Sequence, residues 1–211
     1  LKHFFSSPMY ILNASMGVIF TFILPIALLF NRDLLSVLFS DEFPGIAGLT
    51  GPFVLLVLCG IATTNIISAP SISLEGKNLW IAQSIPVKAS DVLMSKAFTH
   101  MTVCLPSVLF AGVMLNLILD INPLTRVLLF LTPAALTVFQ AMFGVAVNLR
   151  FPKFDWISEM IAVKQGASTL IAMFGAMALV ALPTILYASI LSSLIRPEIY
   201  IALVTGLIAA L

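Results

Sequence analysis

Apolar residues in this sequence form long runs, and within them hydrophobic and polar positions do not alternate. Polar and charged residues gather in the stretches between the runs. A helix needs about 20 apolar residues to cross a hydrocarbon core about 30 Å thick. The pattern therefore predicts about six membrane-spanning helices, the last of which is cut off by the end of the sequence. The predicted spans are residues 9–30, 46–69, 98–119, 127–147, 167–194 and the truncated 199–211.

The composition agrees with a membrane protein. Apolar residues make up 61% of the 211 residues and charged residues 9%, whereas an ordinary soluble domain has roughly 25% charged residues. Only helices and closed barrels can cross a bilayer, and a barrel would show alternating segments of about ten residues. We therefore predict an all-α, polytopic transmembrane helical bundle, embedded in the lipid bilayer as a single domain over residues 1–211. The net charge of +1 gives no indication of a nucleic acid partner.

Lysine and arginine are distributed unevenly between the two sides of the predicted bundle. Seven lie before the first span or in the connections that follow the second and fourth spans, and three lie in the other connections. Because positive residues favour the cytoplasmic side, we expect the N-terminus and the two longer connections, 70–97 and 148–166, to face the cytoplasm. The seven are Lys2, Lys77, Lys88, Lys96, Arg150, Lys153 and Lys164, and the three are Arg32, Arg126 and Arg196.

The predicted spans carry no recognisable reactive chemistry. None of the complete spans has Asp, Glu, Lys or Arg at its centre, and the sequence has no His-Glu-x-x-His, Gly-x-Ser-x-Gly or phosphate-binding Gly-rich loop. Cys59 and Cys104 have no neighbouring ligands, so we predict no metal site. From the missing motifs we predict no catalytic residue and no cofactor held by this chain. His100 is interpreted as structural. Interhelical hydrogen bonds are expected from Asn13, Asn65, Asn116 and Gln140.

The connection 70–97 predicts a short helix lying across the ends of the spans. Ser73 can cap this helix, Glu75 lies in its first turn, and Pro86 ends it. Trp80 lies beside its apolar face, and a second helix is expected to run from Ser90 into the third span. Two interpretations stay open. The helix can lie in the headgroup layer with the tryptophan as an anchor, or it can be a docking element for a cytoplasmic partner.

The connection 148–166 has the same two interpretations. Asp155 can cap a helix whose apolar face includes Trp156. The segment is either a second contact with a partner or an interfacial helix. The residues predicted for such a contact are Phe154, Asp155, Trp156, Glu159 and Lys164.

Two motifs in register, together with the opening segment, resemble the membrane subunits of bacterial ATP-binding-cassette exporters, in particular the exporter permeases common in Firmicutes. The first extends from Ser71 to Lys96 and contains Glu-Gly-Lys-Asn-x-Trp at 75–80 and Ser-Ile-Pro at 84–86. The second is Asn-Leu-Arg-Phe-Pro-Lys-Phe-Asp-Trp at 148–156, and the opening segment is Phe-Phe-Ser-Ser-Pro-x-Tyr-Ile-Leu-Asn at 4–13. The resemblance covers nearly the whole chain and implies one half of a longer permease.

This resemblance implies a transport component in the bacterial cytoplasmic membrane that is not itself an enzyme. ATP and Mg²⁺ would be bound by a separate ATPase subunit, and the other expected partner is a second permease half or a second copy of the chain. The helix between the second and third spans would couple ATP hydrolysis to transport. The residues implied in that coupling contact are Glu75, Gly76, Lys77, Asn78, Trp80, Ser84 and Pro86.

Two other functions are weighed against this one. An ion-coupled secondary transporter would need ionisable residues or unwound helices at mid-membrane, and the predicted spans offer neither. An intramembrane enzyme would need a nucleophile or a metal constellation in a part of the protein outside this sequence.

Overall fold

The computed structural model describes residues 10–12, 15–31, 49–78, 80, 84 and 86–211, apart from the side chains of Lys77 and Glu159. Every regular element in this part of the chain is a helix, which confirms the all-α prediction for the described residues. The elements are α3 (Met16–Phe30), α6 (Thr50–Thr63), η1 (Ser73–Asn78), α8 (Ala89–Ile118), α9 (Pro123–Arg150), α10 (Glu159–Gln165), α11 (Ala167–Ser189), η2 (Leu191–Ser193) and α12 (Pro197–Ala210).

Three of these helices, α8, α9 and α11, are long and apolar enough to cross a membrane. The helices α3, α6 and α12 are also apolar but contain only 15, 14 and 14 residues. At 1.5 Å per residue they are about 21–23 Å long, which is shorter than a hydrocarbon core of about 30 Å. The prediction of about six spans is therefore not supported by the described helices.

The second predicted span shows why the hydrophobic pattern overestimated helix length. It was expected to reach residue 69, but α6 ends at Thr63. The hydroxyls of Thr63 and Thr64 donate to the carbonyls of Gly60 and Ile61, three residues back. Gln140 of α9 donates to the carbonyls of Thr63 and Asn65, which the end of the helix leaves without an intrahelical partner. Residues 64–72 then continue as irregular backbone that is mostly buried.

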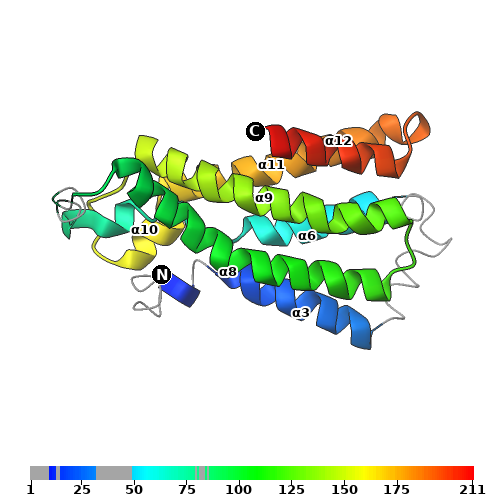
Figure 1. The fold of residues 1–211 in the computed structure, drawn as a ribbon, viewed down its shortest axis with the longest axis horizontal. Coiled ribbons are helices and arrows are strands. Elements are labelled where there is room, and N and C mark those ends of the chain that lie inside the picture. The colour runs from blue at the N-terminus through cyan, green and yellow to red at the C-terminus, as the bar shows by residue number, and fades with distance from the viewer. Residues whose placement is uncertain (1–9, 13–14, 32–48, 79, 81–83, 85) are drawn as a thin grey trace.

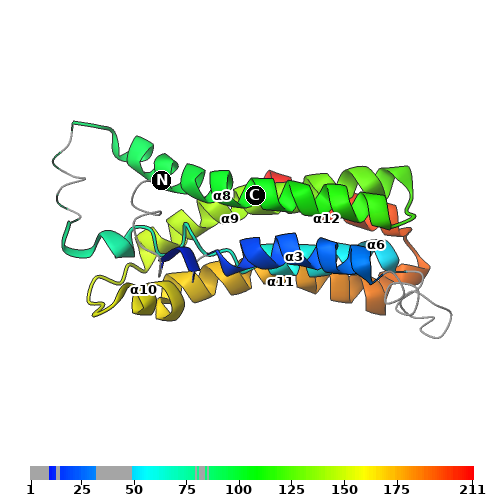
Figure 2. The same ribbon diagram turned by 90° about the horizontal axis from the view of Figure 1, so that it is seen from below.

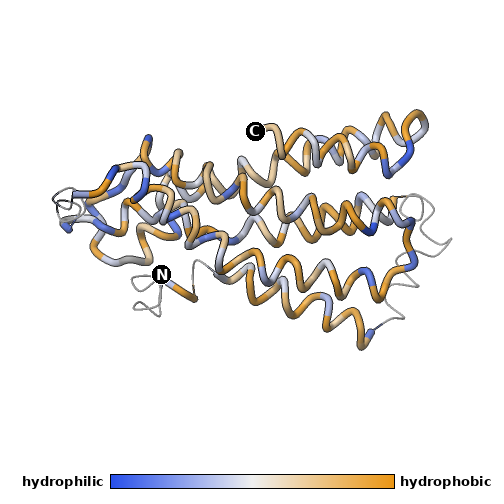
Figure 3. The backbone as a smooth tube through the Cα atoms, viewed as in Figure 1, coloured by the Kyte–Doolittle hydropathy of each residue, from blue (hydrophilic) through white to orange (hydrophobic). Residues whose placement is uncertain are grey.

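The helices lie along one long axis, with α9 in the middle of the bundle (Figure 1). α9 packs against α6, α8, α11 and α12, and α3 packs against α8 and α6. The largest hydrophobic cluster joins α6, α9, α11 and α12 through residues such as Leu55, Leu129, Ala176 and Ile201. Apolar residues dominate the middle of the bundle in the hydropathy colouring (Figure 3).

The two connections predicted to face one side of the membrane lie at one end of the molecule (Figure 2). The hydroxyl of Tyr10 donates to the carbonyl of Ile67, and the indole of Trp156 donates to the carbonyl of Ser73. These bonds bring the start of the described chain, the end of the second predicted span and the later connection together. We call this the η1 end, and the end that holds the short connection between α8 and α9 the opposite end.

Candidate docking surface

The helix predicted between Ser73 and Pro86 differs from the structure. The described part is a 3-10 helix, η1, that ends at Asn78. Gly76 interrupts its helical geometry with a φ of 49°, a conformation that residues with a Cβ rarely adopt. The prediction of an apolar helical face also included Ile81 and Ile85, which lie outside the described residues.

Ser73, the first residue of η1, is held through all its polar atoms. Its N–H donates to Oδ1 of Asn148 at 3.0 Å, and its Oγ accepts from Nδ2 of the same residue at 2.7 Å. Its Oγ also accepts from the backbone N–H of Lys153 at 2.9 Å, and its carbonyl accepts from Nε1 of Trp156 at 2.7 Å. The hydroxyl thus binds the later connection instead of capping its own helix. The two cytoplasmic connections predicted from the sequence are joined at this residue.

Trp156 also covers the break in η1. A Cβ added to Gly76 would lie 3.2 Å from Cζ2 of the Trp156 ring. The ring therefore packs closely on the backbone at the one position of η1 where the φ angle is positive. A tryptophan predicted as a surface contact is instead half-buried and stabilises the conformation of η1.

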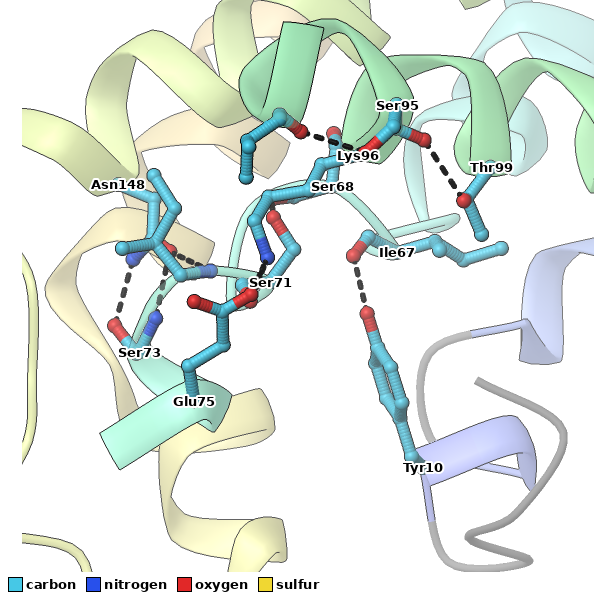
Figure 4. A network of polar contacts seen from close by, with 12 residues as sticks. Tyr10, Ile67, Ser68, Ser71, Ser73, Glu75, Ser95, Lys96, Thr99 and Asn148 are labelled. Carbon is cyan, nitrogen blue, oxygen red and sulfur yellow. Dashed lines mark hydrogen bonds and ion pairs between the residues drawn. The ribbon is translucent and has the colours of Figure 1, made fainter. Parts of the chain in front are cut away.

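Lys96 of α8 makes the third connection to this segment. Its Nζ donates to the carbonyl of Ser71 at 3.0 Å and forms an ion pair with Glu75 (Figure 4). The ion pair and this carbonyl contact are partly buried, so they are less screened by salt than a surface pair. Glu75 is thus turned toward α8 instead of toward a free surface.

A stripe along α9 holds the irregular backbone of residues 64–72. Gln140 donates through Nε2 to the carbonyls of Thr63 and Asn65 at 2.8 and 2.9 Å. One turn later, a Cβ added to Gly144 would lie 2.3 Å from Oγ of Ser68. One further turn on, Asn148 reaches η1. Residues at four-residue intervals lie on the same face of a helix, so this face of α9 matches the irregular segment along its length.

These bonds provide hydrogen-bond partners for buried backbone groups, which are costly when left unpaired. The predicted hydrogen-bonding role is correct for Gln140, which joins α9 to the end of α6. Asn116 also bonds between helices, since its Nδ2 donates to the carbonyl of Arg126 in α9 at 3.4 Å as well as to that of Gly112 in α8. The side chain of Asn65 bonds within its own segment, to the carbonyl of Ala62. Asn13 lies outside the described residues. His100 is fully buried, and its Nδ1 accepts from the N–H of Ser68 at 3.4 Å, which agrees with the structural interpretation.

Beyond the fixed start of η1, the surface is exposed and carries apolar side chains. Trp80 is 64% exposed, and Asn78, Ser84 and Pro86 are also exposed. From the other connection, Phe154, Asp155 and Lys164 are exposed as well, whereas the side chain of Glu159 lies outside the described residues. We define the docking surface as Asn78, Trp80, Ser84, Pro86, Phe154 and Asp155.

A pocket of about 450 Å³ opens between η1, the first turns of α8 and the loop after α9. The Lys96–Glu75 pair forms its polar part, and apolar side chains form most of the rest. Phe154 of the docking surface is one of its walls. No group of three or more metal-ligating side chains occurs among the described residues. The arrangement can bind an apolar or aromatic group, but it offers no reacting constellation.

Sequence reasoning missed the residues that hold this surface together. Asn148 was recognised only as part of a motif, and Ser168 and Gly144 were not singled out. The spacing of Gln140, Gly144 and Asn148 is the signal that could have found them, since small and polar residues at four-residue intervals mark a close helical contact.

Comparison with known proteins gives one match. A family model with the description "Putative ATP-binding cassette" matches residues 49–211. No curated protein and no solved structure matches the chain.

This match corrects several expectations drawn from the sequence. The resemblance to exporter permeases, the permease function with its keywords, and the absence of enzyme activity were predicted, with ATP and Mg²⁺ assigned to a partner subunit. The matching family is described as an ATP-binding cassette and not as a permease, so it contradicts these assignments and associates ATP with this family. Hydropathy and short motifs were not specific enough to separate the components of such a system.

The described residues do not themselves fit a bound nucleotide. A phosphate-binding loop presents open backbone N–H groups before a helix and ends in Gly-Lys-Ser/Thr. The sequence contains no such motif. Gly76, followed by Lys77 and Asn78, is the described glycine with a positive φ, and the ring of Trp156 covers it. No nucleotide chemistry follows from this geometry.

Proposed function

Because the chain belongs to the family described as putative ATP-binding cassettes, we propose that it is a membrane-embedded component of an ATP-binding-cassette transporter. We propose further that its docking surface binds another subunit of that transporter. The observation that carries this proposal is the contrast within one short segment. The start of η1 is fixed by bonds from α9 and from the later connection, while Trp80, seven residues on, is largely exposed.

The membrane location is supported by the outward faces of the helices. Large apolar side chains are exposed along α3, α8, α9, α11 and α12, as expected for helices surrounded by lipid. The three short helices α3, α6 and α12 pack beside the long ones, and we place all six in the bilayer. Exposed examples are Phe20, Leu117, Leu131, Leu182 and Leu203.

The charge distribution supports an orientation with the η1 end in the cytoplasm of a bacterial cell. More basic residues lie at this end than at the opposite end, in line with the positive-inside rule. The docking surface would then face cytoplasmic proteins. The basic residues at the η1 end are Lys77, Lys88, Lys96, Arg150, Lys153 and Lys164, and those described at the opposite end are Arg126 and Arg196.

The composition of the surface supports protein binding. Trp80 is largely exposed, and tryptophan is enriched among residues that dominate interface energy. Phe154 and the neighbouring pocket extend the apolar area. Of the contact residues predicted from the sequence, we assign direct contact to the exposed residues Trp80, Asn78, Ser84 and Pro86. Gly76, Glu75 and Trp156 hold the conformation. The partner predicted from the sequence is an ATPase subunit, and a further membrane subunit of the transporter is the alternative.

Site-specific crosslinking in native membranes tests this proposal. A photo-crosslinking residue at position 80 or 154 of the full-length protein should capture another transporter subunit, which mass spectrometry then identifies. The same residue at position 30 is the control, because Phe30 is 81% exposed at the opposite end. Capture at 80 and not at 30 supports the proposal. Lipid adducts alone at position 80 would favour the interfacial interpretation and overturn docking.

Replacement of the tryptophan gives a quantitative test. Trp80→Ala should weaken association with the captured subunit by about 30-fold, as expected for an aromatic hot spot. Phe30→Ala is the matched control and should leave the affinity unchanged. Equal affinity of wild type and Trp80→Ala would remove Trp80 from the interface.

A further inference from the structure

We propose that Asn148 is a positioning residue that ties the docking surface to α9 and α11 as one body. This inference rests on the proposed docking function and adds the route by which docking acts on the membrane helices. The sequence suggests a different route, along the continuous helix α8. The contacts of the described residues favour α9 and α11.

Asn148 uses its full hydrogen-bonding capacity across three elements. Its Oδ1 accepts from the backbone N–H of Ile72 at 2.8 Å and of Ser73 at 3.0 Å. Its Nδ2 donates to Oγ of Ser73 at 2.7 Å and to Oγ of Ser168 at 2.9 Å. A carboxamide can accept two bonds and donate two. One side chain on α9 therefore binds η1 and the first turn of α11 at the same time.

Burial makes this connection stiff. Asn148, Ser73 and Ser168 are almost completely excluded from solvent, and the backbone N–H groups of residues 72 and 73 depend on the carboxamide. Breaking these bonds would leave several buried polar groups unpaired, each at a cost of about 1–3 kcal/mol. When a force acts on η1, the movement that costs the least free energy is therefore one in which η1, α9 and the start of α11 move together.

The route through α8 is weaker in this structure. The described polar contact between α8 and residues 71–75 is the side chain of Lys96, a flexible four-carbon stem that is only partly buried. Leu93, Ala97 and Met101 of α8 also pack in one apolar cluster with Ile72, but apolar packing lacks directional bonds and allows packed helices to slide by small amounts. We infer that binding at the docking surface displaces α9 and α11 with respect to α8.

Distance distributions between nitroxide labels test this inference without the partner. One label replaces Asn78 on η1, and the second is placed at an exposed position on α9 (Met142), α11 (Leu170) or α8 (Met94). Because Asn78 belongs to the docking surface, association of the labelled protein with the captured subunit is measured first. Cys59 and Cys104 are fully buried, and a sample without introduced cysteines checks that they stay unlabelled. In wild type, the 78–142 and 78–170 distributions should be narrow.

The variants test the bonds from Asn148 to residues 72 and 73 separately from its bond to Ser168 of α11. Asn148→Leu should broaden both distributions by about twofold, since four bonds in one buried network are lost. Ser168→Ala should broaden only the 78–170 distribution. Asn148→Asp keeps the acceptors for the η1 backbone and should keep the 78–142 distribution narrow. A difference between the Asp and Leu variants would show that the hydrogen bonds, and not only the packing of the side chain, hold η1. Thr102→Ala is the control, because that hydroxyl bonds only the carbonyl of Phe98 in its own helix.

Two outcomes decide the inference, and they are distinct from failure of the proposed function. Distributions in Asn148→Leu and Ser168→Ala as narrow as in wild type would overturn it, whether or not a partner binds. When the captured subunit is added, the 78–94 distance should shift while the 78–142 and 78–170 distances stay constant. A shift in 78–142 instead would show that docking acts through α8. If crosslinking at position 80 captures no protein, the docking function fails. The distance distributions measured without the partner still decide whether Asn148 holds η1, α9 and α11 together.

Discussion

The two ends of the bundle differ in how they pair their polar groups. At the η1 end, irregular buried backbone receives hydrogen bonds from α8, α9 and the connection 148–166. At the opposite end, the short turn between α8 and α9 is closed by exposed contacts. Asn122 caps α9 through a bond from the N–H of Leu124 at 2.9 Å, and Arg126 lies 3.7 Å from the exposed carboxylate of Asp120.

The comparison shows where this sequence uses buried polar groups. The exposed turn between α8 and α9 can be hydrated, so its backbone depends less on partners inside the protein. The irregular residues 64–72 are mostly buried, and each of their polar groups needs a partner inside the protein. Such an arrangement is expensive to build and is expected where a defined surface has to be held in one conformation.

The largest effect is expected from breaking the stripe of α9. Gln140→Leu removes two hydrogen bonds and leaves the carbonyls of Thr63 and Asn65 unpaired, so we expect a loss of roughly 2–3 kcal/mol in the free energy of unfolding. Unfolding in mixed micelles of a mild detergent and sodium dodecyl sulfate measures this. A change below about 0.5 kcal/mol would mean that the stripe contributes little to stability.

A smaller loss is expected from filling the close contact one turn away. Gly144→Ala would place its Cβ 2.3 Å from Oγ of Ser68 and 3.0 Å from the backbone nitrogen of Ala69. We expect destabilisation of about 1–3 kcal/mol in the same unfolding assay. Gly206→Ala in α12 is the matched control. It meets nothing within 4 Å and should gain about 0.5–1 kcal/mol from helix propensity.

The opposite end should respond only through its cap. Asn122→Ala removes the side-chain acceptor for the N–H of Leu124, and we expect a loss of about 1 kcal/mol. Asn122→Asp keeps the acceptor and should retain the stability of wild type. If Asn122→Ala destabilises the protein more than Gln140→Leu, the proposed difference between the two ends is wrong.

The smallest effect is expected from the surface pair. Arg126 and Asp120 are well exposed, and such pairs contribute little because solvent and salt screen them. Asp120→Asn should leave the unfolding midpoint unchanged at both low and high salt. A salt-dependent loss of stability would show that this end carries an ionic contact stronger than its exposure suggests.

The helical class of the fold could be predicted from the sequence because apolar runs without alternation have few structural solutions in a bilayer. The end of the second apolar helix could not. α6 ends at Thr63, six residues before the predicted end of the apolar run, and the backbone there is bound by Gln140 of α9, a long-range contact that hydropathy does not register. The start of α8 was predicted, because a helix was expected to run from Ser90 into the third span and α8 begins at Ala89, with Lys88 and not Ser90 as its N-cap residue.

The sequence predicted which two connections form the candidate site, but not the contacts that hold them together. The two tryptophans were both expected at the surface, but one of them packs on Gly76 and the other is exposed. Their roles depend on long-range contacts that a single sequence does not reveal. Ser73 illustrates this best, since its predicted role as a local cap is replaced by bonds to residues 75 to 83 positions away.

These long-range bonds have a consequence for synthesis of the protein. The backbone N–H of Ile72 can bond to Asn148 only after the ribosome has made Asn148, which is 76 residues later in the chain. At roughly 5–20 residues per second, a ribosome needs about 4–15 s to make that stretch. During this interval the segment after α6 has no partner from α9 and must stay hydrated or bound by an insertion factor. The end of α6 therefore reaches its final packing only after α9 has been made.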